Sequence, residues 1–467
     1  MFKKILLRGF LTVFVLVFSI FALFLMVNWG DEALRPEVQA ELNWQPPKVI
    51  DEDNGYLLLL GLHAKEGVDP LTLGKRKLAA ELLRYEKRQQ SADDHAVGAK
   101  DPDEAVFVQA KSAVCDYSLT ANCVEFYLSR SVEQELDILQ SQQLLLSNFD
   151  RLKSSSRYQE ITPPYIDAVF PPLAGVMHAA ELERMRAIRL ISIGKSTQGL
   201  DELLQLLRFS QRWLENSQSL ISHLVALASV QKDLRVVDEL MQKFPELFVE
   251  QHRIRQWLNG FSNDRMSIAK AFKFERQVSL HSIRSALAAP EELQESWLEG
   301  QFIKVFNRPN AALNLTYDWH TPRMQLLQKP IAQYSKGQAD LEAKEKALLG
   351  FGIANIYLRD PIIKILLSIS SPQFETYIEK HHDTFAQINL LALKLDILKQ
   401  NIAVTAIPKF VQEHATEYPN PYDGKALGWD AEKQQLFVEL RQASNQLFQK
   451  SKIVRLDVLP RPELSTK

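Results

Sequence analysis

The feature that most constrains this chain is an uncharged, apolar run near its N-terminus. The 22 residues from Gly9 to Gly30 carry no charge, and most of them are large and apolar. About 20 apolar residues in a helix, rising 1.5 Å each, span the hydrocarbon core of a bilayer. The run therefore predicts a transmembrane helix over residues 9–29, anchored by Phe10, Val13, Val17, Phe21, Leu25 and the interfacial Trp29.

The charges on either side of this run predict its orientation. Lys3, Lys4 and Arg8 precede it, whereas Asp31 and Glu32 follow it. Because basic residues stay on the cytoplasmic side, residues 1–8 form a cytoplasmic tail and the rest of the chain lies across the membrane. We therefore expect a single-pass protein of the bacterial inner (cytoplasmic) membrane, in contact with the lipid bilayer, with its main domain in the periplasm.

A cleaved signal peptide is the alternative interpretation of the same run. Signal peptides have an apolar region of about 7–15 residues that ends in a small-x-small cleavage site. Residues 24–29 offer no such site, and Val38-Gln39-Ala40 lies too far beyond the apolar region. The sequence favours an anchor that is not cleaved.

The charge balance argues against nucleic acid as a partner. Of the 55 basic and 57 acidic residues, three basic ones precede the anchor, so the remainder is acidic overall. A nucleic-acid-binding protein should show the opposite bias and a basic stripe. The short basic run Lys75-Arg76-Lys77 is instead typical of a solvated helix face.

The two cysteines, Cys115 and Cys123, predict one disulfide bond. Outside the cytoplasm a lone close pair of cysteines is usually oxidised. Eight residues of helix would span about 12 Å, whereas the Cα atoms of bonded cysteines lie within about 7 Å. The chain must therefore turn between them, and we expect the turn at 118–122. Two unrelated buried thiols are the alternative.

Beyond the anchor the sequence predicts a mainly helical protein. Residues 30–50 are expected to be a linker, made extended by Trp44-Gln45-Pro46-Pro47. Residues 51–384 are expected to form a helical domain on the far side of the membrane. Leucine spacing and short breaks at 194–197 and 216–219 predict three consecutive helices over 173–244, an array of antiparallel α-hairpins that resembles tetratricopeptide-type solenoids without a fixed repeat.

Two stretches in the middle of the chain are harder to interpret. Residues 291–306 have helical spacing, whereas 307–322 contain two prolines and are expected to be irregular. Residues 361–371 are apolar and, together with the preceding helical run over 338–358, suggest a second membrane span. Arg359, Asp360 and Lys364 interrupt it, and each costs roughly 2.5–3.5 kcal/mol in mid-membrane, so we reject a span there.

Residues 385–467 are expected to form a C-terminal module of a helix and a small β-hairpin. After the helix come Pro419-Asn420-Pro421-Tyr422-Asp423-Gly424-Lys425-Ala426-Leu427-Gly428-Trp429. This segment resembles a module of uncharacterised, membrane-anchored bacterial helical proteins and, over 385–440, the end of type II secretion pseudopilins. Asn420 and Ala426 replace the aspartate and proline of the pseudopilin pattern. The resemblance implies structure rather than chemistry, and the missing aspartate argues against a calcium site.

Two polar pairs are the candidate sites. Asp318 and His320 fall in the proline-bounded stretch, where loops often hold catalytic residues. Glu379 and His382 form a Glu-x-x-His pair of the kind that binds metal in helical bundles, but only one such motif occurs. A polar helix end is the competing interpretation. The charged residues between 181 and 186 are expected to form solvated ion pairs. The motifs predict no metal and no cofactor.

Two classes of function remain compatible with this sequence. The first is a non-enzymatic scaffold of the cell envelope, whose helical surface binds another envelope protein. The second is an envelope hydrolase whose carboxylates meet only in the folded protein. A cleft with converging acidic or histidine side chains favours the enzyme, and a concave helical surface favours the scaffold.

The anchor and its orientation can be tested directly. A reporter enzyme that is active only outside the cytoplasm should be active when it is fused after Lys467, because one uncleaved span separates the two ends. Mass spectrometry of the purified chain should find Met1 or Phe2 at its start. A mature chain that begins near Glu41 would contradict the uncleaved anchor.

Overall fold

The computed structural model describes most of the chain. The described residues are 2–50, 52–90, 101–108, 113–249, 252–261, 268–288, 307–327, 329, 333–349, 359–360, 363–364, 367, 374–441 and 453–458. The helix predicted at 291–306 and most of the apolar stretch 361–371 lie outside them. Within the described part the protein is mainly helical, with one small antiparallel sheet.

The helices follow one another along the chain with short connections. In the N-terminal half they are α1 Phe2–Val27, α2 Pro36–Leu42, α3 Gly55–Leu60, α4 Pro70–Gln90, α5 Cys123–Leu128, α6 Val132–Ser141, α7 Gln143–Ser154, α8 Leu173–Ser192 and α9 Ser196–Asn216. In the C-terminal half they are α10 Leu220–Lys243, α11 Glu246–Val249, α12 His252–Gly260, α13 Ala269–Ala288, α15 Pro309–Leu327, α16 Tyr334–Leu349, α19 Phe374–Lys399, the 3₁₀ turn η4 Val404–Ala406 and α20 Ile407–Glu413.

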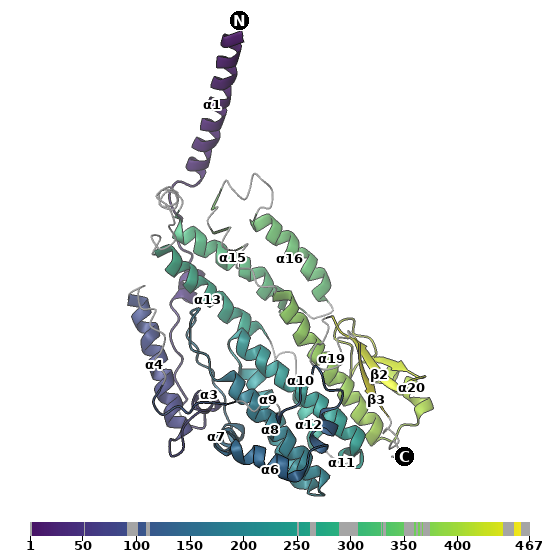
Figure 1. Cartoon of the computed structure of the whole chain (residues 1–467). Helices are drawn as coiled ribbons and strands as arrows, with labels where there is room; N and C mark the ends of the chain where they lie inside the picture. The colour runs from purple at the N-terminus through teal and green to yellow at the C-terminus, as the bar shows by residue number, and fades with distance from the viewer. Residues whose placement is uncertain are drawn as a thin grey trace.

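Helix α1 projects from the body of the protein as a single long rod (Figure 1). Its segment Arg8–Val27 is long and apolar enough to cross a membrane, with a mean hydropathy of 2.9 and no burial against the body. Phe10 and Trp29 are 71% and 83% exposed, so most anchor side chains face outward. Leu25 is the exception, since it is partly covered.

Helices α8, α9 and α10 form the centre of the body, as the leucine spacing predicts. Leu203 and Leu207 are 0% exposed and Trp213 is 1% exposed, which confirms that these side chains belong to the core. The Trp213 indole donates to Ser222 Oγ at 3.2 Å, so the end of α9 contacts the start of α10. Gly194 turns the chain between α8 and α9 with a φ of +83°, a conformation that suits glycine.

Glu181, Glu183 and Arg184 of α8 are buried, which contradicts the expectation of solvated pairs, whereas Arg186 is partly exposed. Arg184 is fully buried and donates to Asp233 of α10 at 2.8 and 2.6 Å. It also lies 3.0 Å from Glu181. The physical reason is that α5, α7, α9 and α10 all pack against α8, so that few of its positions can face solvent. Its charges are accommodated because they pair with one another.

The cysteine segment is tied to this centre. The sulfurs of Cys115 and Cys123 lie at disulfide distance, 2.00 Å, and their Cα atoms are 5.7 Å apart. The chain turns between them, where the amide of Thr120 donates to the carbonyl of Asp116 at 2.8 Å. Arg235 of α10 donates to the carbonyls of Tyr117 and Ala121, both at 2.9 Å. The turn is thereby fixed against α10.

The segment predicted to be a linker is docked on α13 and α15. Arg35 donates to Asn314 O and to Asp318, both at 2.8 Å. Glu41 pairs with the buried Arg276 of α13. A small apolar cluster seals the contact, formed by Val38, Leu42, Leu280 and Leu313. The polar and apolar contacts together fix the chain between α1 and the body.

The irregular structure expected over 307–322 is wrong, because α15 runs through it with Pro322 inside. Pro309 opens the helix, where its missing N–H costs nothing. The carboxylate of Asp31 accepts the amides of Asn310 and Ala311 at 2.8 and 3.0 Å and so caps the helix. This cap comes from a distant part of the chain, so local sequence cannot reveal it.

The C-terminal module contains three strands rather than the two of the expected hairpin. Strands β1 Gly428–Asp430, β2 Gln435–Glu439 and β3 Ile453–Asp457 form an antiparallel sheet in the order β1-β2-β3. Trp429 pairs with Leu436, and Leu436 pairs with Leu456. Helix α19 runs unbroken across residue 384, the predicted domain boundary, and packs against β2 and β3.

The buried pair of α8 and α10 yields a stability prediction. Arg184→Met should lower the free energy of unfolding by about 3–5 kcal/mol, because Asp233 would stay buried without its partner. Arg253 and Asp201 form a surface pair in which both side chains are 44% exposed, so Arg253→Met should cost less than about 1 kcal/mol. Urea denaturation of the full chain in detergent measures both. Equal losses would show that burial of the pair is energetically unimportant.

Candidate functional site

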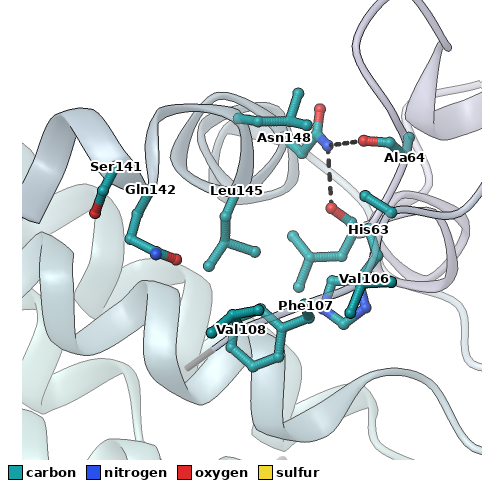
Figure 2. A pocket seen from close by; sticks show the side chains of 12 residues that line it. His63, Ala64, Val106, Phe107, Val108, Ser141, Gln142, Leu145 and Asn148 are labelled. Atoms are coloured by element: carbon teal, nitrogen blue, oxygen red, sulfur yellow. Dashed lines mark hydrogen bonds between the residues drawn. The ribbon is translucent and has the colours of Figure 1, made fainter. Parts of the chain in front are cut away.

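An apolar groove opens where the segment 104–108 crosses the N-terminal end of α7 (Figure 2). Its volume is about 260 Å³, and its walls are mainly apolar. Val106, Phe107 and Val108 form one side, and Leu144 and Leu145 form the other. Gln142 and Asn148 supply amide groups at its edges, so the groove combines an apolar floor with a few polar contacts, as ligand sites commonly do.

Phe107 is held between two imidazole rings. Its ring stacks on His63 with a centroid distance of 4.9 Å and meets the ring of His178 edge-on at 5.6 Å. His178 is 1% exposed, and burial lowers its pKa. A neutral His178 therefore packs as an aromatic wall behind Phe107, which keeps the floor of the groove rigid.

Asn148 and Gly175 set the position of His63. The amide of Asn148 donates to the carbonyls of Leu62 and Ala64 at 3.0 and 3.1 Å and so holds the turn between them (Figure 2). A Cβ atom at Gly175 would lie 2.3 Å from His63 Nε2. Only glycine lets the imidazole approach α8 this closely, so this part of the groove depends on Gly175.

The apolar side chains at the rim of the groove are unusually exposed. Val106 is 76% exposed, Val108 is 70% exposed and Leu144 is 39% exposed. The amide of Ala105 donates to His63 O at 2.8 Å. Within the part of the chain that the structure describes, the backbone of 106–108 forms no hydrogen bond. An extended, apolar segment with open backbone groups can pair with another extended chain.

The first polar pair predicted from the sequence lies on α15. The Asp318 carboxylate accepts from Arg35 at 2.8 Å and thus belongs to the docked linker. His320 is 1% exposed and lies edge-on to Trp319 at 4.7 Å. Burial, followed by the charges of Arg323 and Arg276, lowers the pKa of His320 to about 3. This pair is structural in character.

The second predicted pair, Glu379 and His382, lies within α19 rather than at a helix end. The carbonyl of Glu379 accepts from the Tyr422 hydroxyl at 3.3 Å. The His382 ring contacts those of His381 and Tyr422, with centroids 5.4 and 6.4 Å away. The first pair therefore lies on α15 and the second on α19. Among the described residues no three His, Cys, Asp or Glu side chains are placed to hold a metal ion.

The groove residues were missed by the sequence analysis. Val106-Phe107-Val108 is a short apolar run of β-branched and aromatic residues, which is typical of an extended segment. This side of the groove could therefore have been predicted from the sequence. The contribution of α7 could not, because the approach of 104–108 to α7 depends on Asn148 and Gly175, each distant in sequence from the segment.

The buried histidines predict that acid destabilises the fold. The pKa values of His281 and His381 are lowered to about 4, and those of His320 and His382 to about 3, in each case first by burial. In the unfolded chain they bind protons below about pH 6.5. The unfolded state therefore binds more protons, and stability falls by up to about 1.4 kcal/mol per pH unit for each histidine as the pH drops from 6.5 towards 4.

Thermal unfolding of the full chain between pH 7.5 and 4.5 checks this expectation. The unfolding temperature should decrease with pH, and His320→Gln should make the decrease less steep by removing one proton uptake. A flat profile in the unsubstituted protein would contradict it.

Comparison with known proteins finds no significant match to this chain. No protein-family model, no curated protein and no solved structure matches it significantly.

Proposed function

We propose that this chain is a membrane-anchored protein of the bacterial envelope that binds another envelope protein through the groove at 104–108. In this proposal α1 crosses the inner membrane, the body lies in the periplasm as an array of antiparallel α-hairpins, and an extended segment of the partner occupies the groove. The observation that carries the proposal is the exposure of Val106 and Val108, in a segment without helix or strand, beside an apolar cavity.

The geometry of the groove supports an extended peptide as its occupant. An added strand would use the open backbone of 106–108 for hydrogen bonds, and its alternate side chains would point into the cavity. A volume of about 260 Å³ suits one or two apolar side chains. Burying each such side chain contributes roughly 1.5–3 kcal/mol, which gives a moderate and reversible affinity.

The hydrolase alternative has less support. Glu160 is the buried carboxylate that lines another cavity, and burial raises its pKa. However, its oxygens accept the amide of Gln218 at 2.9 Å and the hydroxyl of Ser219 at 2.9 Å. They cap the start of α10, so the carboxylate is engaged in holding the fold.

Site-specific crosslinking in intact membranes tests the proposal. A photo-crosslinking residue at position 144, on the rim of the groove, should yield one discrete adduct. The pair Val106→Asp and Val108→Asp should reduce that adduct by about tenfold or more, because a buried charge opposes docking. A crosslinker at Val132, which is 41% exposed on α6, is the matched control and should yield none. Equal adducts at both positions, or insensitivity to the aspartates, would contradict this function.

A further inference from the structure

A second hollow flanks the docked linker, on both sides of Trp44. One cavity of about 350 Å³ lies between the linker, α4 and α13. Another of about 400 Å³ lies between the linker, the segment 158–160 and the other half of α13. Trp44 lines both. We call the two cavities together the Trp44 cleft.

Helix α13 forms one wall along the length of the Trp44 cleft. Lys270 and Gln277 line the second cavity and Arg284 lines the first. Positions 270 and 284 are separated by about 20 Å along a helix. The two cavities therefore lie along one helix with Trp44 between them, an arrangement that suits an extended chain of several rings better than one small molecule.

Trp44 is fixed in place from both directions. Before it, Glu41 accepts from Arg276 Nε at 2.9 Å. After it, Gln159 accepts the amide of Ile50 at 2.9 Å and donates to Lys48 O at 3.1 Å. The edge of Tyr85 packs against the indole with centroids 5.1 Å apart. Because Trp44 is only partly buried, a preorganised aromatic surface remains available to a ligand.

Amide side chains dominate the polar lining. Asn43, Gln89, Gln159 and Asn216 each have one hydrogen bond or more to neighbouring residues. Among the described residues, the side chains of Gln45, in the first cavity, and Gln277, in the second, form none. Each amide offers donors and an acceptor on neighbouring atoms, a pattern that matches the adjacent hydroxyls of a sugar ring. An aromatic ring meets the apolar C–H face of the same sugar, since its own surface is apolar with a negative π face.

The charges in the cleft do not select a charged ligand. Glu86 and Glu160 oppose Arg284, Lys270 and Lys273, so both signs are present. Arg284 is already engaged with His281 Nδ1 at 3.1 Å, and Glu160 is engaged at the start of α10. The groups left for recognition are the indole and the amides of Gln45 and Gln277, one on each side of Trp44.

We propose that the Trp44 cleft binds an extended, uncharged oligosaccharide, with one sugar ring stacked on Trp44 and its neighbours hydrogen-bonded by amides on either side. The site is separate from the groove at 104–108 and does not depend on it.

Calorimetric titration of the full chain tests this binding. The protein is kept in a detergent without a sugar headgroup, because such headgroups would compete. The probes are hexamers of β-1,4-linked N-acetylglucosamine, β-1,4-linked glucose and α-1,4-linked glucose, which distinguish an amino-sugar glycan from plain glucans. At least one hexamer should bind, and its monosaccharide should bind about tenfold more weakly or worse, because one ring fills only part of the cleft.

Three tryptophan variants separate stacking from general effects. Trp44→Ala should weaken the binding of the hexamer about tenfold or more, and Gln277→Ala should weaken it measurably. Trp29→Ala is the matched control, since Trp29 is 83% exposed at the end of α1, and it should bind like the unsubstituted chain. Trp44→Phe keeps a smaller ring and should lose less affinity, which guards against a folding defect.

Several outcomes would overturn the proposal. The first is that none of the three hexamers binds. The second is that Trp44→Ala binds the hexamer as well as Trp29→Ala does. The third is that an uncharged Ser/Asn hexapeptide binds at the Trp44 cleft with higher affinity than every hexamer. The last result would assign the cleft to a peptide.

Discussion

The buried ion pair between Arg184 and Asp233 is the contact on which the arrangement of the body depends. A guanidinium group and a carboxylate without water around them tolerate one alignment of α8 against α10, because a slip would leave both unpaired at a cost of several kcal/mol. Burial works against the charge of Glu181, but Arg184 and Lys232 outweigh it and lower its pKa. Glu181 therefore keeps its charge beside Arg184, and the contacts at the centre of the protein are directional rather than only apolar.

Other elements join this centre through buried charges of the same kind. Helix α7 contributes Lys153, which pairs with Glu183 of α8, and both side chains are 1% exposed. Helix α19 contributes Lys394, which pairs with Asp238 of α10 at 2.5 Å. Arg235 holds the cysteine turn. We infer that these pairs select one packing among the many that leucine-rich helices permit, since apolar contacts alone are not directional.

The sequence predicted the parts of the fold that follow from local periodicity. The three helices over 173–244, the core positions Leu203, Leu207 and Trp213, and the turn between the cysteines all depend on residues a few positions apart. The errors arose where a distant residue decides the local structure. Asp31, which is distant in the sequence, caps α15. Residues 307–322 taken alone contain two prolines, which predict a break rather than a helix. The apolar residues next to Glu181 and Arg184 in the sequence indicated that this part of α8 is buried. The partners on α10 were needed to explain how these charges are accommodated.

The docked linker fixes the positions of both proposed sites relative to α1. The groove lies by α6 and α7, at the end of the body away from α1, whereas the linker and α13 lie near α1 (Figure 1). A flexible tether would leave the distance of either site from a membrane undefined. The ion pair between Glu41 and Arg276 prevents this, because it fixes the linker to α13 only three residues before Trp44. The same contact that orients the body relative to α1 therefore also sets the indole between its two cavities. The geometry of the Trp44 cleft and the attachment of α1 cannot vary independently.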